Sequence, residues 1–114
     1  MVGVDIVYVP RFRKAIEKHG ERFLKRVFSD EELRLCFLRA NPDVCLAGRW
    51  ACKEAVFKAF YAHNGTKLRL RDIEITKGPE GEPVLRIKGR EEYRIKVSIS
   101  HDGDYAIAVA YVLK

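Results

Sequence analysis

Residues 49–60, RWACKEAVFKAF, constrain the fold of this chain more than any other stretch. Their apolar side chains recur with helical spacing and belong to a predicted long helix from about residue 44 to residue 62. A helix buried on all sides should exclude charge, yet Lys53, Glu54 and Lys58 lie in the middle of this one. These residues therefore form a solvent-exposed edge, or they face a ligand that needs charge.

The segment before this helix predicts a strand followed by shorter helices. Residues 2–9 are rich in Val, which suits a strand buried on both faces. Pro10 can open the helical region that follows, and Gly20 is a plausible stop within it. The run SDEE at residues 29–32 is typical of a capping box, with Ser at the N-cap and Glu three residues later.

After the long helix the hydrophobic period changes from helical to two. Residues 68–75 suggest one strand with a break near Asp72, and further strands are expected at residues 84–89, 93–100 and 105–113. Small Ala residues alternate with larger ones in the last of these. The order of strand, helices and antiparallel sheet predicts one α+β domain over residues 1–114.

The charge balance points to an acidic partner. The chain has 22 Lys and Arg against 16 Asp and Glu, a formal charge of +6. Such an excess favours nucleic acid, an anionic membrane, a phosphorylated small molecule or an acidic protein. No stretch approaches the ~20 apolar residues of a membrane span, and the first apolar run lacks the basic leader of a signal peptide. A cytoplasmic protein is expected, in which Cys36, Cys45 and Cys52 are reduced thiols.

Four charged residues invite two interpretations each. Glu54 and Lys58 are four apart, so they could form an exposed ion pair, or they could bind a hard metal and a phosphate. Asp5, inside an apolar strand, must be exposed, paired or coordinating. Asp5 and Glu54 together could hold Mg²⁺, which takes one or two carboxylates plus water and substrate phosphates. His101 follows a strand, where it is either a turn residue or a donor to phosphate.

Three motifs occur in order along the chain: GVDIV at residues 3–7, RWACKEAVFKAF, and VSISHD at residues 97–102. Together they resemble the holo-acyl-carrier-protein synthase family, the small phosphopantetheinyl transferases. The most specific element is G-x-D paired with W-x-x-K-E-A-x-x-K, and the resemblance extends from residue 2 to about residue 112. It implies the fold of that family and transfer of 4′-phosphopantetheine from coenzyme A to a serine of apo acyl carrier protein, within fatty acid biosynthesis. Adenosine 3′,5′-bisphosphate is the second product.

The resemblance also implies roles for individual residues. Asp5 and Glu54 correspond to the Mg²⁺ ligands that hold the pyrophosphate, and Glu54 also helps to deprotonate the serine. Lys58 corresponds to a lysine beside the phosphates, which neutralises charge on the departing nucleotide. Arg49 and His101 correspond to contacts with the nucleotide phosphates. These roles suit phosphoryl transfer, which asks mainly for positioning and electrostatic stabilisation.

Further implications concern partners. Arg11 and Arg22 correspond to residues that meet the acidic carrier protein. Members of the family are compact homotrimers, which would bring Asp5, Glu54 and Lys58 from one subunit to the Arg49 and His101 of its neighbour. The glycine-rich turn after the family's lysine is replaced here by YAHNGTK, so the long helix is expected to run about a turn further.

Two alternatives accompany this assignment. A small basic nucleic-acid-binding module could use KLRLR or RFRK for phosphate contacts. Its basic residues would be scattered, however, and Asp5 and Glu54 would be unexplained. The other alternative is a structural homologue that has lost catalysis, against which the intact acidic pair and lysine argue.

Overall fold

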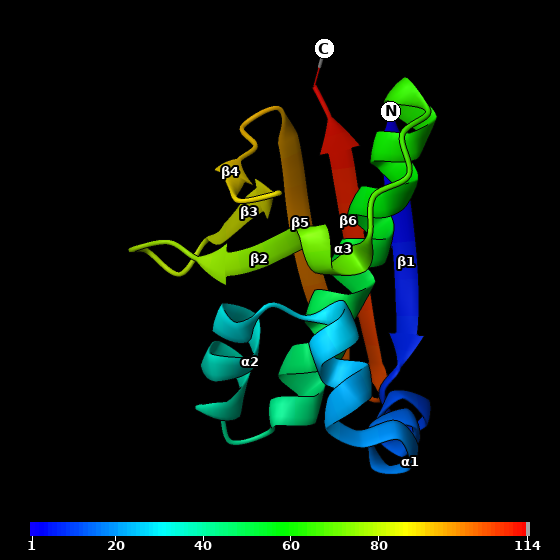
Figure 1. Ribbon diagram of the computed structural model, residues 1–114, viewed down its shortest axis with the longest axis vertical. Helices are drawn as coiled ribbons and strands as arrows, with labels where there is room; N and C mark the ends of the chain where they lie inside the picture. The colour runs from blue at the N-terminus through cyan, green and yellow to red at the C-terminus, as the bar shows by residue number, and fades with distance from the viewer. Residues whose placement is uncertain (114) are drawn as a thin grey trace.

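The structure, a computed structural model, describes residues 1–113, and the last residue of the predicted domain, Lys114, lies outside the described residues. The chain begins with a strand, continues through three helices and ends in a series of strands (Figure 1). The elements are β1 (Val2–Tyr8), α1 (Val9–Val27), α2 (Asp30–Phe37), α3 (Pro42–Asn64), the short 3₁₀-helix η1 (Leu70–Asp72), β2 (Ile73–Lys77), β3 (Pro83–Ile87), β4 (Arg90–Glu91), β5 (Ile95–Asp102) and β6 (Tyr105–Val112).

The strands form two antiparallel sheets of three strands each, one in the order β1-β6-β5 and the other in the order β2-β3-β4. The first strand of the chain thus pairs with the last (Figure 1). Helix α3 packs on β1, β6 and β5. The α+β class is confirmed, but the predicted antiparallel sheet is divided into two sheets, and the N-terminal strand joins the first of them.

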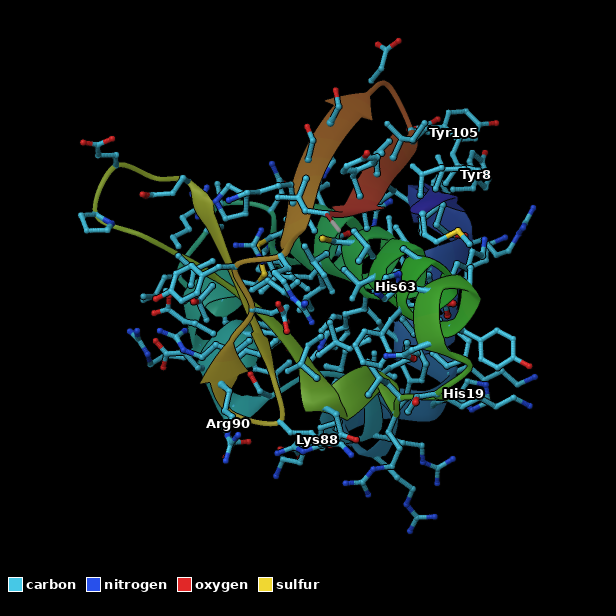
Figure 2. The ribbon with its side chains drawn as sticks, turned by 90° about the horizontal axis from the view of Figure 1, so that it is seen from above. Tyr8, His19, His63, Lys88, Arg90 and Tyr105 are labelled. Carbon is cyan, nitrogen blue, oxygen red and sulfur yellow. A yellow bond between two sulfur atoms is a disulfide. The ribbon has the colours of Figure 1, made fainter. Side chains whose placement is uncertain are left out.

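Only one face of β1 is covered, so the prediction that it is buried on both faces is wrong. Gly3 and Val7 are buried, whereas the alternate residues are exposed. The exposed residues continue onto β6 through cross-strand pairs such as Val4 with Val109. We call this surface the outer apolar face; its residues are Val2, Val4, Ile6, Tyr8, Tyr105, Ile107, Val109 and Tyr111, each between 38% and 62% exposed. Figure 2 shows Tyr8 beside Tyr105, with ring centroids 5.3 Å apart.

The local signals in the helical region behave as expected. Gly20 has a φ of 64° and divides α1 into two segments. The capping box forms, because Ser29 Oγ accepts a hydrogen bond from the Glu32 backbone N–H and the Glu32 carboxylate accepts one from the Ser29 N–H. Helix α3 extends to Asn64, beyond the predicted end, and Gly65 terminates it in the left-handed conformation.

Two expectations need correction. Residues 68–75 form η1 and then β2 rather than one strand, since the chain turns before Ile73. Cys36 and Cys45 are joined in a disulfide with Cα atoms 5.4 Å apart, so they are not reduced thiols. The turn between α2 and α3 brings the two cysteines together. Cys52 is a free, buried thiol, and burial raises its pKa to about 12. No helix within residues 1–113 is long and apolar enough to cross a membrane.

Candidate active site

The approach of β1 to α3 builds the first part of the site. A Cβ atom at Gly3 would lie 2.1 Å from the carbonyl oxygen of Ala55 and 2.9 Å from the amide nitrogen of Ala59. Only glycine therefore permits this strand to lie so close to the helix. Asp5, two residues further along, points to the same side of the strand. It reaches α3 where Glu54 and Lys58 lie.

Lys58 binds the strand rather than its helical neighbour. Its Nζ donates to Asp5 Oδ1 over 3.0 Å and to the carbonyl oxygen of Val4 over 3.1 Å. The interpretation of Lys58 as the exposed partner of Glu54, one helical turn earlier, is thus wrong, because the ammonium forms its ion pair with Asp5 instead.

Glu54 is a half-buried carboxyl group beside a second negative charge. Burial raises its pKa above the ordinary value, and the charge of Asp5 raises it further, while Lys58 lowers it. The charges of Asp5 and Lys58 thus act on Glu54 in opposite directions. Within residues 1–113 no group of three or more metal-ligating side chains occurs. The pair Asp5 and Glu54 suits Mg²⁺, which commonly takes one or two protein carboxylates and completes its octahedron with water and substrate phosphate.

These residues line a pocket of about 610 Å³ between β1, α1 and α3, which we call the carboxylate pocket. Its wall includes Trp50 and Arg11, whose guanidinium lies 5.7 Å from the centroid of the Tyr8 ring. The pocket is thus open to a ligand beside the carboxylates and carries a basic residue at its edge. Arg22 does not line it and is exposed on the second segment of α1.

Arg49 and His101 lie in a second pocket, which we call the basic pocket. It measures about 590 Å³, and Arg39 and Lys77 also line it. Arg49 is 9% exposed, and its buried Nε has no hydrogen-bond partner within residues 1–113. Burial lowers the pKa of this guanidinium. His101 Nε2 lies 3.3 Å from the carbonyl oxygen of Val44 at the start of α3. A buried arginine whose Nε has no partner, among three other basic side chains, is suited to an anionic ligand.

The predicted site residues are therefore divided between two pockets of one chain. Asp5, Glu54 and Lys58 converge in the carboxylate pocket, together with Arg11. Arg49 and His101 do not reach that pocket, because Arg49 lies on a different face of α3.

Lys53 fits neither alternative for the charges of residues 49–60, since it belongs to no solvent-exposed edge and faces neither pocket. It is fully buried, and its Nζ lies 2.7 Å from Glu32 Oε1, which is also fully buried. Sequence reasoning identified Glu32 only as part of a capping box. The position of Lys53 could have indicated its burial. It is adjacent to Glu54 in the sequence and therefore lies on another face of the helix.

The chain is similar to curated proteins and to solved structures. The curated holo-[acyl-carrier-protein] synthases of Aquifex aeolicus and Leptospira biflexa are 45% and 44% identical to the chain; the matches cover 100% and 99% of the chain and 98% and 95% of those proteins. The crystal structure of Helicobacter pylori holo-[acyl-carrier-protein] synthase in complex with coenzyme A has a TM-score of 0.82 at 33% identity. That match covers 98% of the chain and 99% of the solved one.

The profile of the 4′-phosphopantetheinyl transferase superfamily matches residues 1–110, nearly the whole chain. With the paired carboxylates and lysine in place, and with relatives of this similarity along its full length, the chain belongs to the 4′-phosphopantetheinyl transferase superfamily.

Proposed function

We propose that this chain transfers 4′-phosphopantetheine from coenzyme A to a serine of apo acyl carrier protein, with release of adenosine 3′,5′-bisphosphate. The observation that carries the proposal is the convergence of Asp5, Glu54 and Lys58 in one open pocket. Holo-[acyl-carrier-protein] synthase is the name of the curated relatives, and coenzyme A is bound in the Helicobacter pylori structure. Both favour the transferase over a nucleic-acid-binding module.

Asp5 and Glu54 would hold a Mg²⁺ ion in this reaction. The ion would neutralise negative charge on the pyrophosphate of coenzyme A. Lys58, now paired with Asp5, is placed to donate to a phosphate oxygen and to stabilise charge on the departing nucleotide. The raised pKa of Glu54 suits a group that accepts the serine proton, directly or through water.

A homotrimer with sites between subunits explains why the two pockets are separate. One chain keeps its basic pocket away from its own carboxylates, so a neighbouring chain would bring Arg49 and His101 to the nucleotide. The outer apolar face supports this assembly. It comprises eight hydrophobic residues of β1 and β6 that are 38–62% exposed in a single chain, a surface that calls for a partner.

The carrier protein would approach along α1. Arg11 lies at the edge of the carboxylate pocket and Arg22 is exposed further along the same helix. Basic residues there would attract an acidic carrier and orient its serine. We further propose that residues 1–114 act as a single transferase domain in the cytoplasm, and that the product serves fatty acid biosynthesis.

Mass spectrometry of apo acyl carrier protein tests the proposal directly. The carrier is incubated with coenzyme A and the chain, with Mg²⁺ or with a chelator. We expect the mass of one phosphopantetheine to be added to the carrier only when Mg²⁺ is present. The Asp5→Asn variant provides the matched control and should add none. An unmodified carrier in the presence of wild-type protein, coenzyme A and Mg²⁺ would disprove the proposed activity.

A further inference from the structure

Helix α3 presents different residues to the two pockets, so its rotation about its own axis decides whether either pocket is complete. Glu54 and Lys58 face the carboxylate pocket, and Arg49 faces the basic pocket. In an α-helix each residue is turned by about 100° from the one before it. A small rotation of α3 would therefore move Glu54 away from Asp5 and Arg49 away from its pocket together.

The side of α3 that packs on the sheet is lined with small apolar side chains. The helix carries a stripe of alanines, Ala47, Ala51, Ala55 and Ala59, each fully buried. The strand β6, on which α3 packs, buries alanines as well, at positions 106, 108 and 110. Methyl groups make no hydrogen bonds or ion pairs, so this stripe adds no directional polar contact that would aim Glu54 or Arg49.

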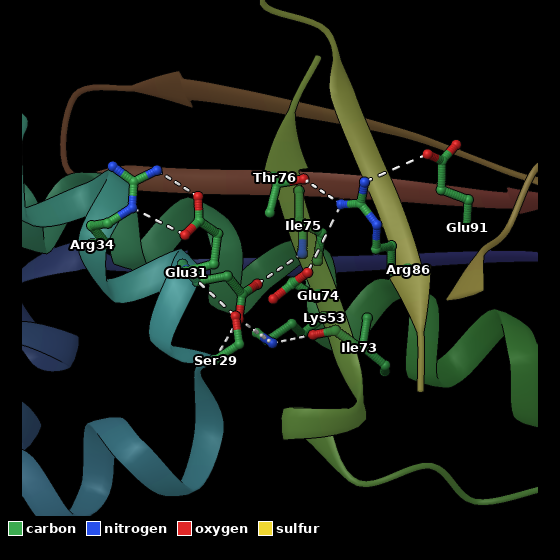
Figure 3. Close-up of polar contacts among 11 residues, drawn as sticks. Ser29, Glu31, Arg34, Lys53, Ile73, Glu74, Ile75, Thr76, Arg86 and Glu91 are labelled. Carbon is green, nitrogen blue, oxygen red and sulfur yellow. Dashed lines mark hydrogen bonds and ion pairs between the residues drawn. The ribbon is translucent and has the colours of Figure 1, made fainter. Parts of the chain in front are cut away.

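Lys53 supplies the directional contact that the alanines lack. Its ammonium donates to Glu32 Oε1 over 2.7 Å, to the carbonyl oxygen of Leu70 over 3.0 Å and to the carbonyl oxygen of Ile73. Three donors thus meet three acceptors, on α2, η1 and β2. Figure 3 shows Lys53 extending from α3 toward Ile73. The Phe28 ring closes the site, with its centroid 5.6 Å from the ammonium.

Glu32 is held equally firmly. Its Oε1 accepts from the backbone N–H of Ser29 and its Oε2 accepts from the backbone N–H of Ile75 over 2.8 Å. The carboxylate cannot follow Lys53 if α3 turns, because α2 and β2 fix it from both sides. Its charge also acts on Arg49, one turn before Lys53, where it partly offsets the effect of burial.

From these contacts we propose that Lys53 is a positioning residue for the transferase reaction. Its buried bond to Glu32 sets the rotation of α3, so that Glu54 and Lys58 meet Asp5 while Arg49 stays in the basic pocket. The inference rests on the proposed function for the reaction, but the rotation itself can be measured without it. Buried ion pairs contribute little net stability compared with apolar residues of similar volume, and specifying one arrangement is a better-attested use of them.

The test compares two ways of destabilising the same helix. The double variant Lys53→Met/Glu32→Gln removes both charges, preserves the approximate side-chain volumes and leaves no unpaired buried charge. Val56→Ala is the matched control: Val56 is a fully buried residue of α3 that takes no part in either pocket. Both are assayed well below their melting temperatures, so that every sample is folded.

We expect the double variant to lose about ten- to a hundredfold in single-turnover rate, the range that a misplacement of about 1 Å can cost. It should also need more Mg²⁺ for half-maximal rate, because Glu54 no longer faces Asp5. Val56→Ala should transfer at close to the wild-type rate whatever its loss of melting temperature. Equal rates in the two variants at equal stability would overturn the positioning role.

A second readout needs no activity. Trp50 is the single tryptophan of the chain and lies on α3 against the rings of Phe12 and Phe23, at centroid distances of 5.4 and 5.3 Å. Its fluorescence emission should shift in the double variant and be unchanged in Val56→Ala. Unchanged emission in the double variant would also overturn the proposal. Comparing the emission of the two variants tests whether Lys53 sets the rotation of α3 even if the wild-type protein transfers no phosphopantetheine.

Should the double variant fail to fold, Glu32→Asp replaces it. The shorter side chain keeps the charge but cannot bond to Lys53, Ser29 and Ile75 together. We expect the same losses in rate and the same shift of emission. A folded Glu32→Asp variant with wild-type rate and emission would overturn the inference.

Discussion

Lys58 and Asp5 form an ion pair between a helix and a strand, with Lys58 Nζ 3.0 Å from Asp5 Oδ1. Lys58 therefore lies beside a carboxylate that we assign to Mg²⁺. The flexible lysine side chain can turn from that carboxylate to a phosphate when the cation and coenzyme A bind. The pair holds the Asp5 carboxylate in place until then.

This relationship predicts that Lys58→Ala reduces turnover more than it reduces affinity for coenzyme A. A preorganised cation acts chiefly where charge develops in the transition state, so the loss should be about 2–4 kcal/mol in the activation barrier. Single-turnover transfer at saturating coenzyme A measures it. Lys88→Ala, at the edge of the second sheet away from β1 (Figure 2), is the control and should be unaffected. A Lys58→Ala rate near that of the wild type would refute the catalytic role.

Glu54→Gln should separate stability from activity. Without metal, burial and the charge of Asp5 raise the pKa of Glu54, so the folded state binds its proton more tightly than the unfolded state does. Ionised Glu54 therefore destabilises the folded state. This effect is absent below the ordinary pKa of a glutamate and complete above the raised pKa of Glu54. At neutral pH we therefore expect the metal-free variant to melt slightly higher than the wild type, by about 1–3 °C, while transfer is nearly abolished.

The raised pKa of Glu54 also predicts that the Mg²⁺ requirement of transfer depends on pH. As pH falls through the raised pKa of Glu54, protons compete with the cation, and the Mg²⁺ concentration for half-maximal transfer should rise. Rates measured across a pH series at several Mg²⁺ concentrations test this. A Mg²⁺ requirement independent of pH in the acidic range would show that Glu54 is not a ligand.

Arg11→Glu should weaken binding of the carrier protein much more than binding of coenzyme A. Arg11 lies at the edge of the carboxylate pocket, where charge steers an acidic partner. Titration of each ligand at two salt concentrations provides the measurement. Arg90→Glu, an equal change of charge on exposed β4, is the control and should leave both affinities unchanged. An equal loss of affinity for the carrier protein and for coenzyme A in Arg11→Glu would show that Arg11 does not bind the carrier protein specifically.

Val109→Glu should disrupt the proposed trimer. Val109 is paired with Val4 at the centre of the outer apolar face, where a buried unpaired charge would be costly. Sedimentation should show a monomer that still melts cooperatively but does not transfer. Tyr93→Glu changes an exposed residue outside this face and should sediment as a trimer. A monomeric wild-type protein with full activity would contradict the assembly.

The disulfide should contribute measurable stability. Closing a loop of this length, with a sequence separation of nine between Cys36 and Cys45, is worth about 2–3 kcal/mol by loop entropy. A reducing agent should therefore lower the melting temperature of the wild type. It should have no effect on the double variant Cys36→Ser/Cys45→Ser, which retains only Cys52. A melting temperature unchanged by reduction in both proteins would show that the bond contributes nothing.

Features set by local chemistry could be predicted from the sequence. The capping box at Ser29 needs only two residues three apart, and it forms as expected. The grouping of Asp5, Glu54 and Lys58 followed from their motifs, because β1 and α3 pack in the way that the family resemblance implies.

What the sequence could not provide depends on contacts between distant segments. The pattern of β1 did not reveal that its outer face is uncovered in a single chain. The pairing of Cys36 with Cys45 depends on how α2 turns into α3. The burial of Lys53 depends on Glu32, 21 positions earlier, and on carbonyl groups that only the folded chain brings together.

Gly3 sets the spacing between β1 and α3 at the site. The strand lies against α3 at a distance that excludes even one methyl group, since a Cβ atom there would be 2.1 Å from a carbonyl oxygen. Any larger residue would move β1 outward and carry Asp5 with it, while Glu54 stayed on the helix. The gap between the two carboxylates is thus fixed by a residue without a side chain. The size of a cation that would fit between them is therefore determined at a position that would never touch it.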